Sequence, residues 1–208
     1  MIRTRRMLCA AVVASMAVVS GTTNAQTYKA HLTALNAEKI GSAAEGDATF
    51  TVVGNSLAIH IKMKGVPANI EHWEHFHGFP DGQDAKCATA DQDRNRDGHI
   101  DLGETEPVMG TTMVPFNDKP EEMNIPTHTY PNADASGVYE YSKVVPLDAL
   151  QARFGETFDG HSIDLDKRVI MVHGVPEGHV LPASVGSLGP IPSHVTIPIA
   201  CGKIEKVG

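Results

Sequence analysis

Aromatic residues and long apolar stretches are both scarce in this chain of 208 residues. Phe, Trp and Tyr make up only 5% of the sequence, whereas Gly and Pro number 19 and 13. This balance disfavours long packed helices and favours many short strands joined by turns. The one extended apolar run, residues 7–19, is too short for a stable membrane span. The length suits a single hydrophobic core, and therefore one domain.

The apolar run has the features of an export signal. Three arginines precede it, and it is followed closely by polar residues ending in Ala25, a small residue that signal peptidase prefers. We expect residues 1–25 to form a signal peptide, cleaved after Ala25, that directs the protein to a bacterial periplasm or the medium. Arg5 and Arg6 leave the twin-arginine route open beside the general one.

Basic residues are also in short supply. Removing the three signal arginines from 17 basic residues leaves 14 against 25 acidic ones, a net charge of −11 with neutral histidines. A chain of this charge is repelled by polyanions. We therefore expect no nucleic-acid partner, and no membrane partner once the signal is removed.

Cysteine is rare, and only Cys87 and Cys201 remain after the signal. Two cysteines in an exported protein most simply form one disulfide. Closing a loop of roughly 100 residues would stabilise the fold by up to about 4 to 5 kcal/mol in the chain-entropy model. Two free thiols are the alternative.

Apolar and polar residues alternate with the period of a β-strand in several segments of the chain. Pro198 confines the last such segment to a sheet edge or a bulge. Only residues 146–154 predict a helix, with Gly155 as its stop. The pattern indicates an all-β, antiparallel sandwich or barrel with long loops over residues 26–208. The segments expected to form strands are 28–35, 49–52, 57–63, 138–145, 168–173 and 195–204.

The candidate functional residues centre on HWEHFH, residues 72–77. His75 and His77 are separated by one residue, so a strand here would project both imidazoles from the same face. Imidazole binds copper, zinc, iron and nickel, so the pair indicates a transition metal without selecting one. Two polar residues on a solvated face are the alternative.

Three segments together resemble the copper/zinc superoxide dismutases. They are HWEHFHGFPDG before Cys87, VIMVHG containing His173, and IPIACGKI around Cys201. That family has an H-x-x-H-x-H strand, a nearby cysteine bonded to one in a final A-C-G strand, and a late histidine. The order and spacing of these segments match over residues 28–204.

The resemblance implies a Greek-key β-sandwich or barrel that binds copper and converts superoxide to oxygen and hydrogen peroxide. His72 matches the structural first histidine of the family. His75, His77 and His173 match copper ligands, and they would be the catalytic residues. Whether the chain forms a homodimer stays open.

The zinc site of that family is missing. Its further histidines and aspartate follow the first cysteine, whereas here residues 88–172 hold only His99, His128 and His161. His128 is the best candidate for a fourth copper ligand, and an ordinary loop histidine is the alternative. Zinc is therefore doubtful.

The arginine that draws superoxide towards copper in the family is also missing. Its position, three residues before the last cysteine, is Pro198. With a net charge of −11, the protein would repel an anion unless a local positive feature overcame the overall field. Copper binding is thus better supported than dismutase activity.

A different motif takes the place of the zinc segment. Residues 93–104, DRNRDGHIDLGE, fit an EF-hand-like calcium loop, with oxygen-bearing side chains at positions 1, 3, 5, 9 and 12 and glycine at position 6. We expect calcium here, within a loop insertion spanning 88–131 and without flanking helices. A metal-free surface turn is the alternative. The calcium ligands would be Asp93, Asn95, Asp97, the backbone carbonyl of His99, Asp101 and Glu104.

Two further groups of residues could assist a metal. Glu71 and Glu74 could orient imidazole rings, or they could be solvated carboxylates on a strand. Met109, Met113 and Met123 could form a Cu(I) carrier site, although methionines of this kind more often fill gaps beneath a loop.

Three functions remain after these considerations. The first is an exported copper-dependent superoxide dismutase. The second is a copper-binding or copper-carrying protein without catalysis, favoured by the missing arginine and zinc ligands. The third is a calcium-stabilised binding module whose histidines have no metal.

Overall fold

The computed structural model describes residues 25–207, and these form one antiparallel β-sheet of nine strands with few helices. The all-β, antiparallel prediction is confirmed at this level. The predicted signal peptide lies outside the described residues except for Ala25. Within the described part, no helix is long and apolar enough to cross a membrane. The strands are β1 (Gln26–Ala34), β2 (Glu45–Val53), β3 (Ser56–Lys64), β4 (Glu74–Gly78), β5 (Thr111–Pro115), β6 (Tyr139–Pro146), β7 (Val169–His173), β8 (Pro198–Lys203) and β9 (Glu205–Val207).

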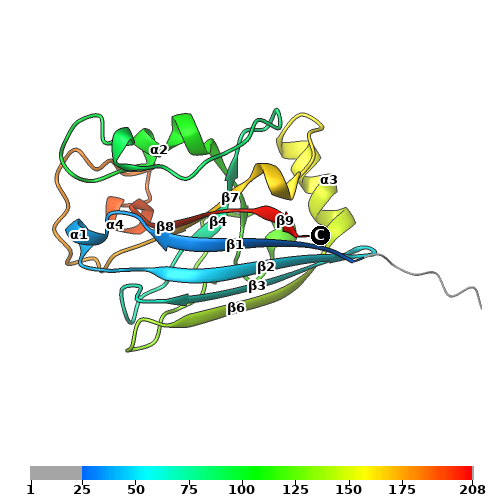
Figure 1. Ribbon diagram of the computed structural model, residues 1–208, viewed down its shortest axis with the longest axis horizontal. Coiled ribbons are helices and arrows are strands. Elements are labelled where there is room, and N and C mark those ends of the chain that lie inside the picture. Colours follow the sequence, from blue (N-terminus) through cyan, green and yellow to red (C-terminus); the bar gives the residue numbers. More distant parts are fainter. Residues whose placement is uncertain (1–24, 208) are drawn as a thin grey trace, which may run out of the picture.

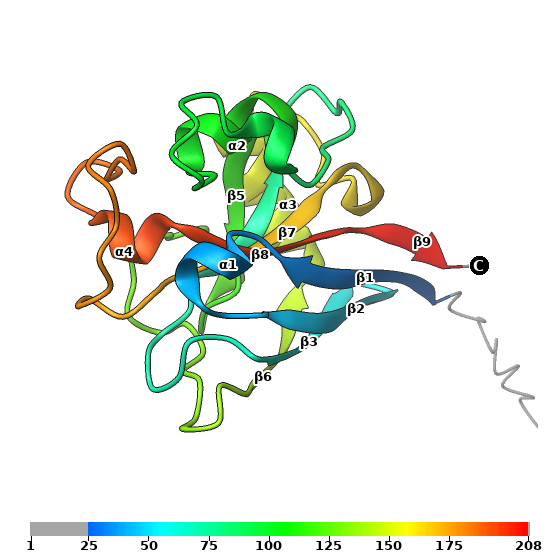
Figure 2. The same ribbon diagram turned by 60° about the vertical axis from the view of Figure 1, so that its left-hand side comes forward.

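The sheet bends at β1, which is shared between two halves. The strand order is β5-β4-β7-β8-β1-β2-β3-β6, and β9 also pairs with β1. One end of β1 pairs with β8 through Thr33 and Ala34, while residues 27–29 pair with β9. The sheet therefore curls, and strands of the two halves run in different directions across the core (Figures 1 and 2).

Alternate residues of both halves meet inside the curl. Phe50 from β2 and Phe76 from β4 pack with ring centroids 5.2 Å apart, and both are fully buried. Burial of apolar side chains at every second position follows the period of two in the sequence. The core residues that share this environment include Leu32, Ile59, Ile61, Ile170, Val172 and Ile199.

Helices connect the strands rather than form a layer of their own. The predicted helix at 146–154 is present as α3, and Leu150 and Phe154 are its buried residues. Gly155 does not end it, because the helix continues to residue 157. In Figure 1, α1, α2 and α4 lie towards one end of the molecule and α3 towards the other. The helices are α1 (Ala37–Ile40), α2 (Leu102–Met109), α3 (Leu147–Thr157) and α4 (Ser193–Thr196), and the 3₁₀ turns are η1 (Ala90–Gln92), η2 (Pro120–Glu122) and η3 (Leu165–Lys167).

The structure differs from two of the sequence-based predictions. The expected strand at 195–204 begins only at Pro198, because the preceding residues form the short helix α4. Pro198 lies opposite His173 where the register shifts, so it occupies the bulge that its missing N–H requires. The expected loop insertion at 88–131 contains α2 and strand β5, which pairs with β4.

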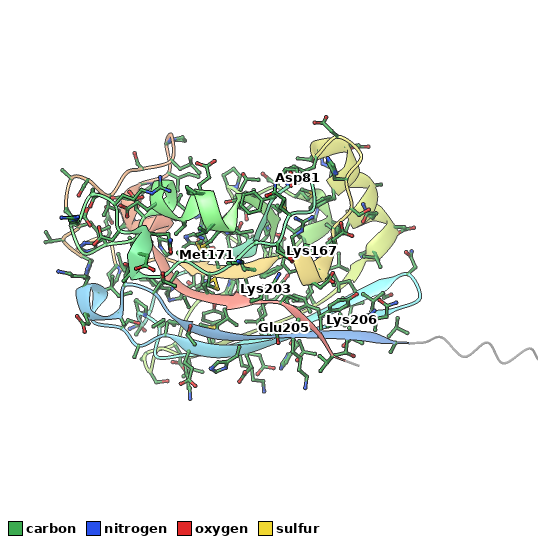
Figure 3. All side chains as sticks on the ribbon, turned by 45° about the horizontal axis from the view of Figure 1, so that its top comes forward. Asp81, Lys167, Met171, Lys203, Glu205 and Lys206 are labelled. Carbon is green, nitrogen blue, oxygen red and sulfur yellow. A yellow bond between two sulfur atoms is a disulfide. The ribbon has the colours of Figure 1, made fainter. Side chains whose placement is uncertain are left out.

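The segment that follows β4 packs on the outer face of β7 and β8, where a disulfide and ion pairs hold it. The predicted disulfide between Cys87 and Cys201 is present. Lys167 and Lys203 both lie near Asp84, with nitrogen–oxygen distances of 3.4 Å and 3.6 Å. Figure 3 labels these two lysines, and also Met171 of β7. A second hydrophobic cluster fills the space beneath this segment, and its members are Leu35, Ala85, Ala88, Ile100, Met109, Val169, Met171 and Cys201.

Candidate metal centre

Three histidines meet on the outer face of the β4 and β7 half of the sheet. His75 and His77 lie on β4, where alternation places them on the same side, and His173 ends the neighbouring strand β7. One ring nitrogen from each lies within 4.8 Å of the others. The ring centroids are 5.0 Å apart for His75 and His173, 5.6 Å for His75 and His77, and 5.7 Å for His77 and His173. We call these residues the histidine trio.

Several ring nitrogens of the trio are buried and have no hydrogen-bond partner, as expected of a metal site. All three residues are buried, with 2–4% of their surface exposed. Both ring nitrogens of His75 and Nε2 of His173 are buried without a hydrogen-bond partner. Buried polar atoms without partners are costly, and several of them pointing into one small space are typical of a site that holds an ion.

Backbone carbonyls orient two of the three rings. The Nδ1–H of His173 donates to the carbonyl of Thr196 at 2.7 Å. Nδ1 of His77 lies 3.4 Å from the carbonyl of Gly110, and the Thr112 hydroxyl lies 3.2 Å from its Nε2. The contact of His173 fixes its tautomer and leaves its Nε2 for a metal, whereas a metal on Nε2 of His77 would replace the contact with the Thr112 hydroxyl. Sequence reasoning missed these partners, since a carbonyl carries no residue signature.

Burial keeps the trio in its metal-binding, neutral form. It lowers the pKa of His77 to about 4, against a hydrogen bond to Gly110 that raises it. Burial and then the nearby His77 lower the pKa of His173 to about 3. Burial, with the proximity of His173 and His77, holds the pKa of His75 well below its usual value. A neutral imidazole nitrogen is the form that coordinates a metal.

His72 lies beside the trio but does not belong to it. It is fully buried, with Nδ1 at 3.0 Å from the carbonyl of His173 and Nε2 at 2.8 Å from that of Pro67. Its ring stacks on Tyr139. Both nitrogens face the backbone, so His72 joins the start of β4 to the end of β7 instead of offering a ligand.

His128 is not brought into the trio. Its side chain is 94% exposed, and its Nδ1 lies 3.4 Å from a carboxylate oxygen of Glu71. Glu71 also accepts hydrogen bonds from the backbone N–H of Tyr130 and from the indole N–H of Trp73. The alternative of an ordinary loop histidine therefore fits this structure, and Glu71 orients residues 128–130 rather than a ring of the trio.

Glu74 points away from the trio and into the core. It accepts a hydrogen bond of 2.8 Å from the hydroxyl of Tyr139, and its other oxygen has no partner. The proposal that it orients an imidazole was wrong, as was the solvated alternative. The alternation of side chains along β4 explains this direction, because residues 74 and 76 must face opposite to residues 75 and 77.

The methionines of the insertion serve packing. Met109 and Met113 are fully buried, the first in the outer cluster and the second in the main core, and Met123 packs against the main core. Met109 thus lies in a different cluster from Met113 and Met123, which argues against one Cu(I) site built from all three.

An apolar roof covers the trio. A cavity of about 20 Å³ touches His75 and His173, and no Lys or Arg is among the residues that line it. The missing family arginine is thus not replaced by another basic residue in this cavity. We call the apolar residues of this lining the roof, and they are Trp73, Leu102, Ile125, Leu188, Ile191 and Val195.

The calcium motif folds into a loop whose polar side chains turn inward. Glu104 is buried and accepts hydrogen bonds from the backbone N–H groups of Arg94 and Asn95, at 2.8 Å and 3.2 Å. Asp93 Oδ2 accepts from Gly98, while its Oδ1 is buried without a partner. Among the described residues, no three carboxylates of this loop approach one another as closely as the nitrogens of the trio.

The prediction that no helix flanks the calcium motif was wrong on one side. Helix α2 begins at Leu102, within the motif, and Asp101 caps it by accepting from the N–H of Glu104 at 3.1 Å. The Asp-x-x-Glu spacing of a capping box was the signal that could have revealed it. On the other side there is only the single turn η1. The arrangement is half of a helix–loop–helix.

A scan against models of known protein families found no match, and a search of curated proteins found no similar sequence.

Proposed function

We propose that this protein is an exported, copper-dependent superoxide dismutase of the Greek-key, dismutase-like fold. The observation that carries the proposal is the histidine trio, with buried imidazole nitrogens facing one another. Three nitrogen ligands suit copper, although zinc, iron and nickel also accept imidazole. The resemblance of HWEHFHG, VIMVHG and IPIACG to the dismutase segments selects copper among them.

The topology is consistent with a Greek key. The chain passes between the two halves of the sheet from β3 to β4, from β5 to β6 and again from β6 to β7. Crossings of this kind distinguish a Greek key from a simple meander. They also bring β4, β7 and β8 side by side, so that the trio and the disulfide occupy one face.

Copper at the trio would supply one-electron chemistry, oxidising one superoxide to oxygen and reducing the next, which takes up two protons from solvent, to hydrogen peroxide. The chain contributes the geometry. The Thr196 and Gly110 carbonyls hold His173 and His77 in position, and burial keeps all three rings neutral. The roof limits the size of any molecule that reaches His75 and His173.

A second function, copper binding without catalysis, is favoured by the roof. Superoxide is an anion, and the cavity over His75 and His173 is lined mainly by apolar residues, with Pro198 where the family has its arginine. The groove that reaches His77 is lined by Asp101 and Glu106 and offers no Lys or Arg either. An anion entering an apolar space loses hydration without gaining a cation. The site would then store or carry copper.

Calcium is proposed for residues 93–104. The motif supplies five side-chain oxygens, and the buried, unpartnered Oδ1 of Asp93 lies in this loop. A calcium ion there would offset the mutual repulsion of Asp93, Asp97, Asp101 and Glu104, and it would hold the loop rigid. If the trio binds no metal, a calcium-stabilised binding module remains as the third function.

Metal analysis of the protein purified from its own cells tests the metal assignments together. We expect about one copper and one calcium per chain, no zinc, and an N-terminus at Gln26 in the periplasmic or secreted fraction. Calcium without copper would leave the binding module, and zinc in place of copper would contradict the redox proposal.

An activity assay separates catalysis from storage. Copper-loaded protein should accelerate superoxide loss beyond a free-copper control, and His173→Gln should abolish copper binding at the trio and the activity. His128→Gln is the matched variant, because His128 is exposed and outside the trio. It should keep both. Protein that holds copper but shows no acceleration would leave the storage function.

A further inference from the structure

The proposed calcium loop and the histidine trio are joined by two routes of direct contacts. The first passes along α2. Asp101 caps the start of this helix, and Gly110 follows its end, where the carbonyl of Gly110 lies 3.4 Å from Nδ1 of His77. A change in the position of the loop therefore moves the group that orients one ring of the trio.

The second route passes through residues 184–196. The hydroxyl of Ser184 donates to Asp97, and the N–H of Gly186 donates to Asp101 at 3.3 Å. The hydroxyl of Thr196 lies 3.5 Å from the carbonyl of Gly186 and 3.3 Å from that of Ser193. The carbonyl of Thr196 in turn accepts from the N–H of His173. This route ends on a second ring of the trio.

The same contacts position the roof. Leu102 follows Asp101 directly at the start of α2, and Leu188 lies two residues beyond Gly186. Both side chains line the cavity over His75 and His173. Residues 102 and 188 also line a neighbouring groove that reaches His77. The roof thus consists partly of residues held in place by the carboxylates of the calcium motif.

Asp97 and Asp101 have two functions in this arrangement. They occupy positions 5 and 9 of the motif, and their carboxylates also hold Ser184 and Gly186. Both oxygens of each carboxylate already accept a hydrogen bond, but an ionised carboxylate has about four lone-pair sites, so it can bind an ion and keep these bonds. Without a cation, four acidic side chains of the motif repel one another, which favours a looser loop and weaker hold on residues 184–188.

We propose that calcium binding at residues 93–104 and copper binding at the histidine trio are positively coupled. The inference rests on the proposed function, since it requires both ions. In structural terms, calcium fixes the carbonyls of Gly110 and Thr196 and closes the roof, so that the trio is preorganised for copper. Thr196 and Ser184 are positioning residues, because they act through other groups and do not touch the metal.

Coupling between two sites is reciprocal, and this provides the test. Copper affinity is measured by competition with a chelator in metal-stripped buffer, with and without calcium, and with magnesium as the control ion. We expect calcium to tighten copper binding by about 5- to 100-fold. Calcium affinity, measured by calorimetry, should rise by the same factor when copper is bound, and the copper(II) electron paramagnetic resonance spectrum should sharpen.

Variants distinguish coupling from calcium binding itself. Glu104→Gln should abolish calcium binding, and with it the effect of calcium on copper. Ser184→Ala and Thr196→Val should still bind calcium but show at least a threefold smaller coupling, and Thr196→Ser should restore it. Glu156→Gln, an exposed carboxylate variant on α3, should behave as the unmodified protein.

Two results would overturn the inference, and they can be told apart. Calcium that binds at residues 93–104 while copper affinity changes by less than twofold removes the coupling and leaves the calcium site. A chain that binds no calcium removes both.

Discussion

Tyr139 donates a hydrogen bond of 2.8 Å to Glu74 inside the core, on the face of β4 opposite to His75. Burial raises the pKa of Glu74 to about 8, although the hydrogen bond from Tyr139 opposes the rise. The carboxyl group is therefore protonated in the folded protein at neutral pH. Desolvation of the charged form outweighs the one hydrogen bond that would favour it.

This relationship predicts how stability changes with pH. Between about pH 4.5 and pH 8, the folded protein retains a proton on Glu74 that the unfolded chain releases, so the free energy of unfolding falls as pH rises. Glu74→Gln has no such proton. Its stability relative to the unmodified protein should therefore improve by on the order of 3 to 5 kcal/mol between pH 5 and pH 9.

Urea unfolding of the metal-free proteins across this range provides the measurement. Glu140→Gln is the control, because Glu140 is an exposed carboxylate on β6, the strand that carries Tyr139. The pH-dependent gain should be specific to Glu74→Gln and should exceed any change seen for Glu140→Gln. A flat difference for Glu74→Gln would show that Glu74 is ionised in the fold.

The low pKa values of the trio predict a copper affinity that is insensitive to mild acid. His77 and His173 titrate at about 4 and about 3, and His75 lies well below its usual value. Copper then displaces no protons from these rings between pH 5 and pH 7. An exposed histidine site would lose affinity below about pH 6.5.

Competition titrations at pH 5, 6 and 7 check this expectation. The affinity should change by less than about threefold over the range, after correction for the chelator. A loss of more than tenfold at pH 5 would mean that the rings are protonated before copper binds.

The same pKa shifts imply that the metal-free fold loses stability as pH falls below about 6.5, because only the unfolded chain then takes up these protons.

The disulfide provides a prediction of stability alone. Cys87 and Cys201 are 114 residues apart in sequence, so the bond greatly restricts the unfolded chain. The double variant Cys87→Ser, Cys201→Ser should lose about 4 to 5 kcal/mol of unfolding free energy. Denaturation with and without reductant provides the comparison, and the reductant should not affect the double variant. A loss below about 1 kcal/mol would contradict the chain-entropy account.

Much of the fold could be predicted because burial follows simple periods. Alternation at 28–35 and 57–63 marked β1 and β3, and the interval of one residue between His75 and His77 placed both rings on one face. The convergence of His173 with them could not be derived from local pattern. It depends on β4 pairing with β7 across nearly 100 residues, and only the family resemblance indicated it.

The wrong predictions also have physical causes, because contacts between distant segments decided the structure there. Strand β5 was assigned to a loop because its five residues were read as part of the calcium insertion, although they pair with β4. Alternation at Val195 and Ile197 suggested a strand, yet Pro192 and Pro198 flank a short helical turn there. The roof has no sequence signature, because Leu102, Ile125 and Leu188 are apolar residues on separate loops and helix ends.

The roof leads to a final prediction about catalysis. Leu188 is 55% exposed and lines the cavity above His75 and His173, where no Lys or Arg contributes. Leu188→Lys would place a cation at the approach to the trio, in a protein of negative net charge. If superoxide is the substrate, this variant should raise the second-order rate constant by about two- to tenfold at low ionic strength. The gain should shrink as salt is added, because exposed charges are screened within about 10 Å at 0.1 M.

The control variant Leu188→Gln opens the roof to a similar extent without adding charge, so it separates the effect of access from that of electrostatic attraction. Pulse radiolysis of both copper-loaded variants gives the rate constants directly. An equal effect of Lys and Gln, independent of salt, would show that the roof limits passage by size rather than by charge.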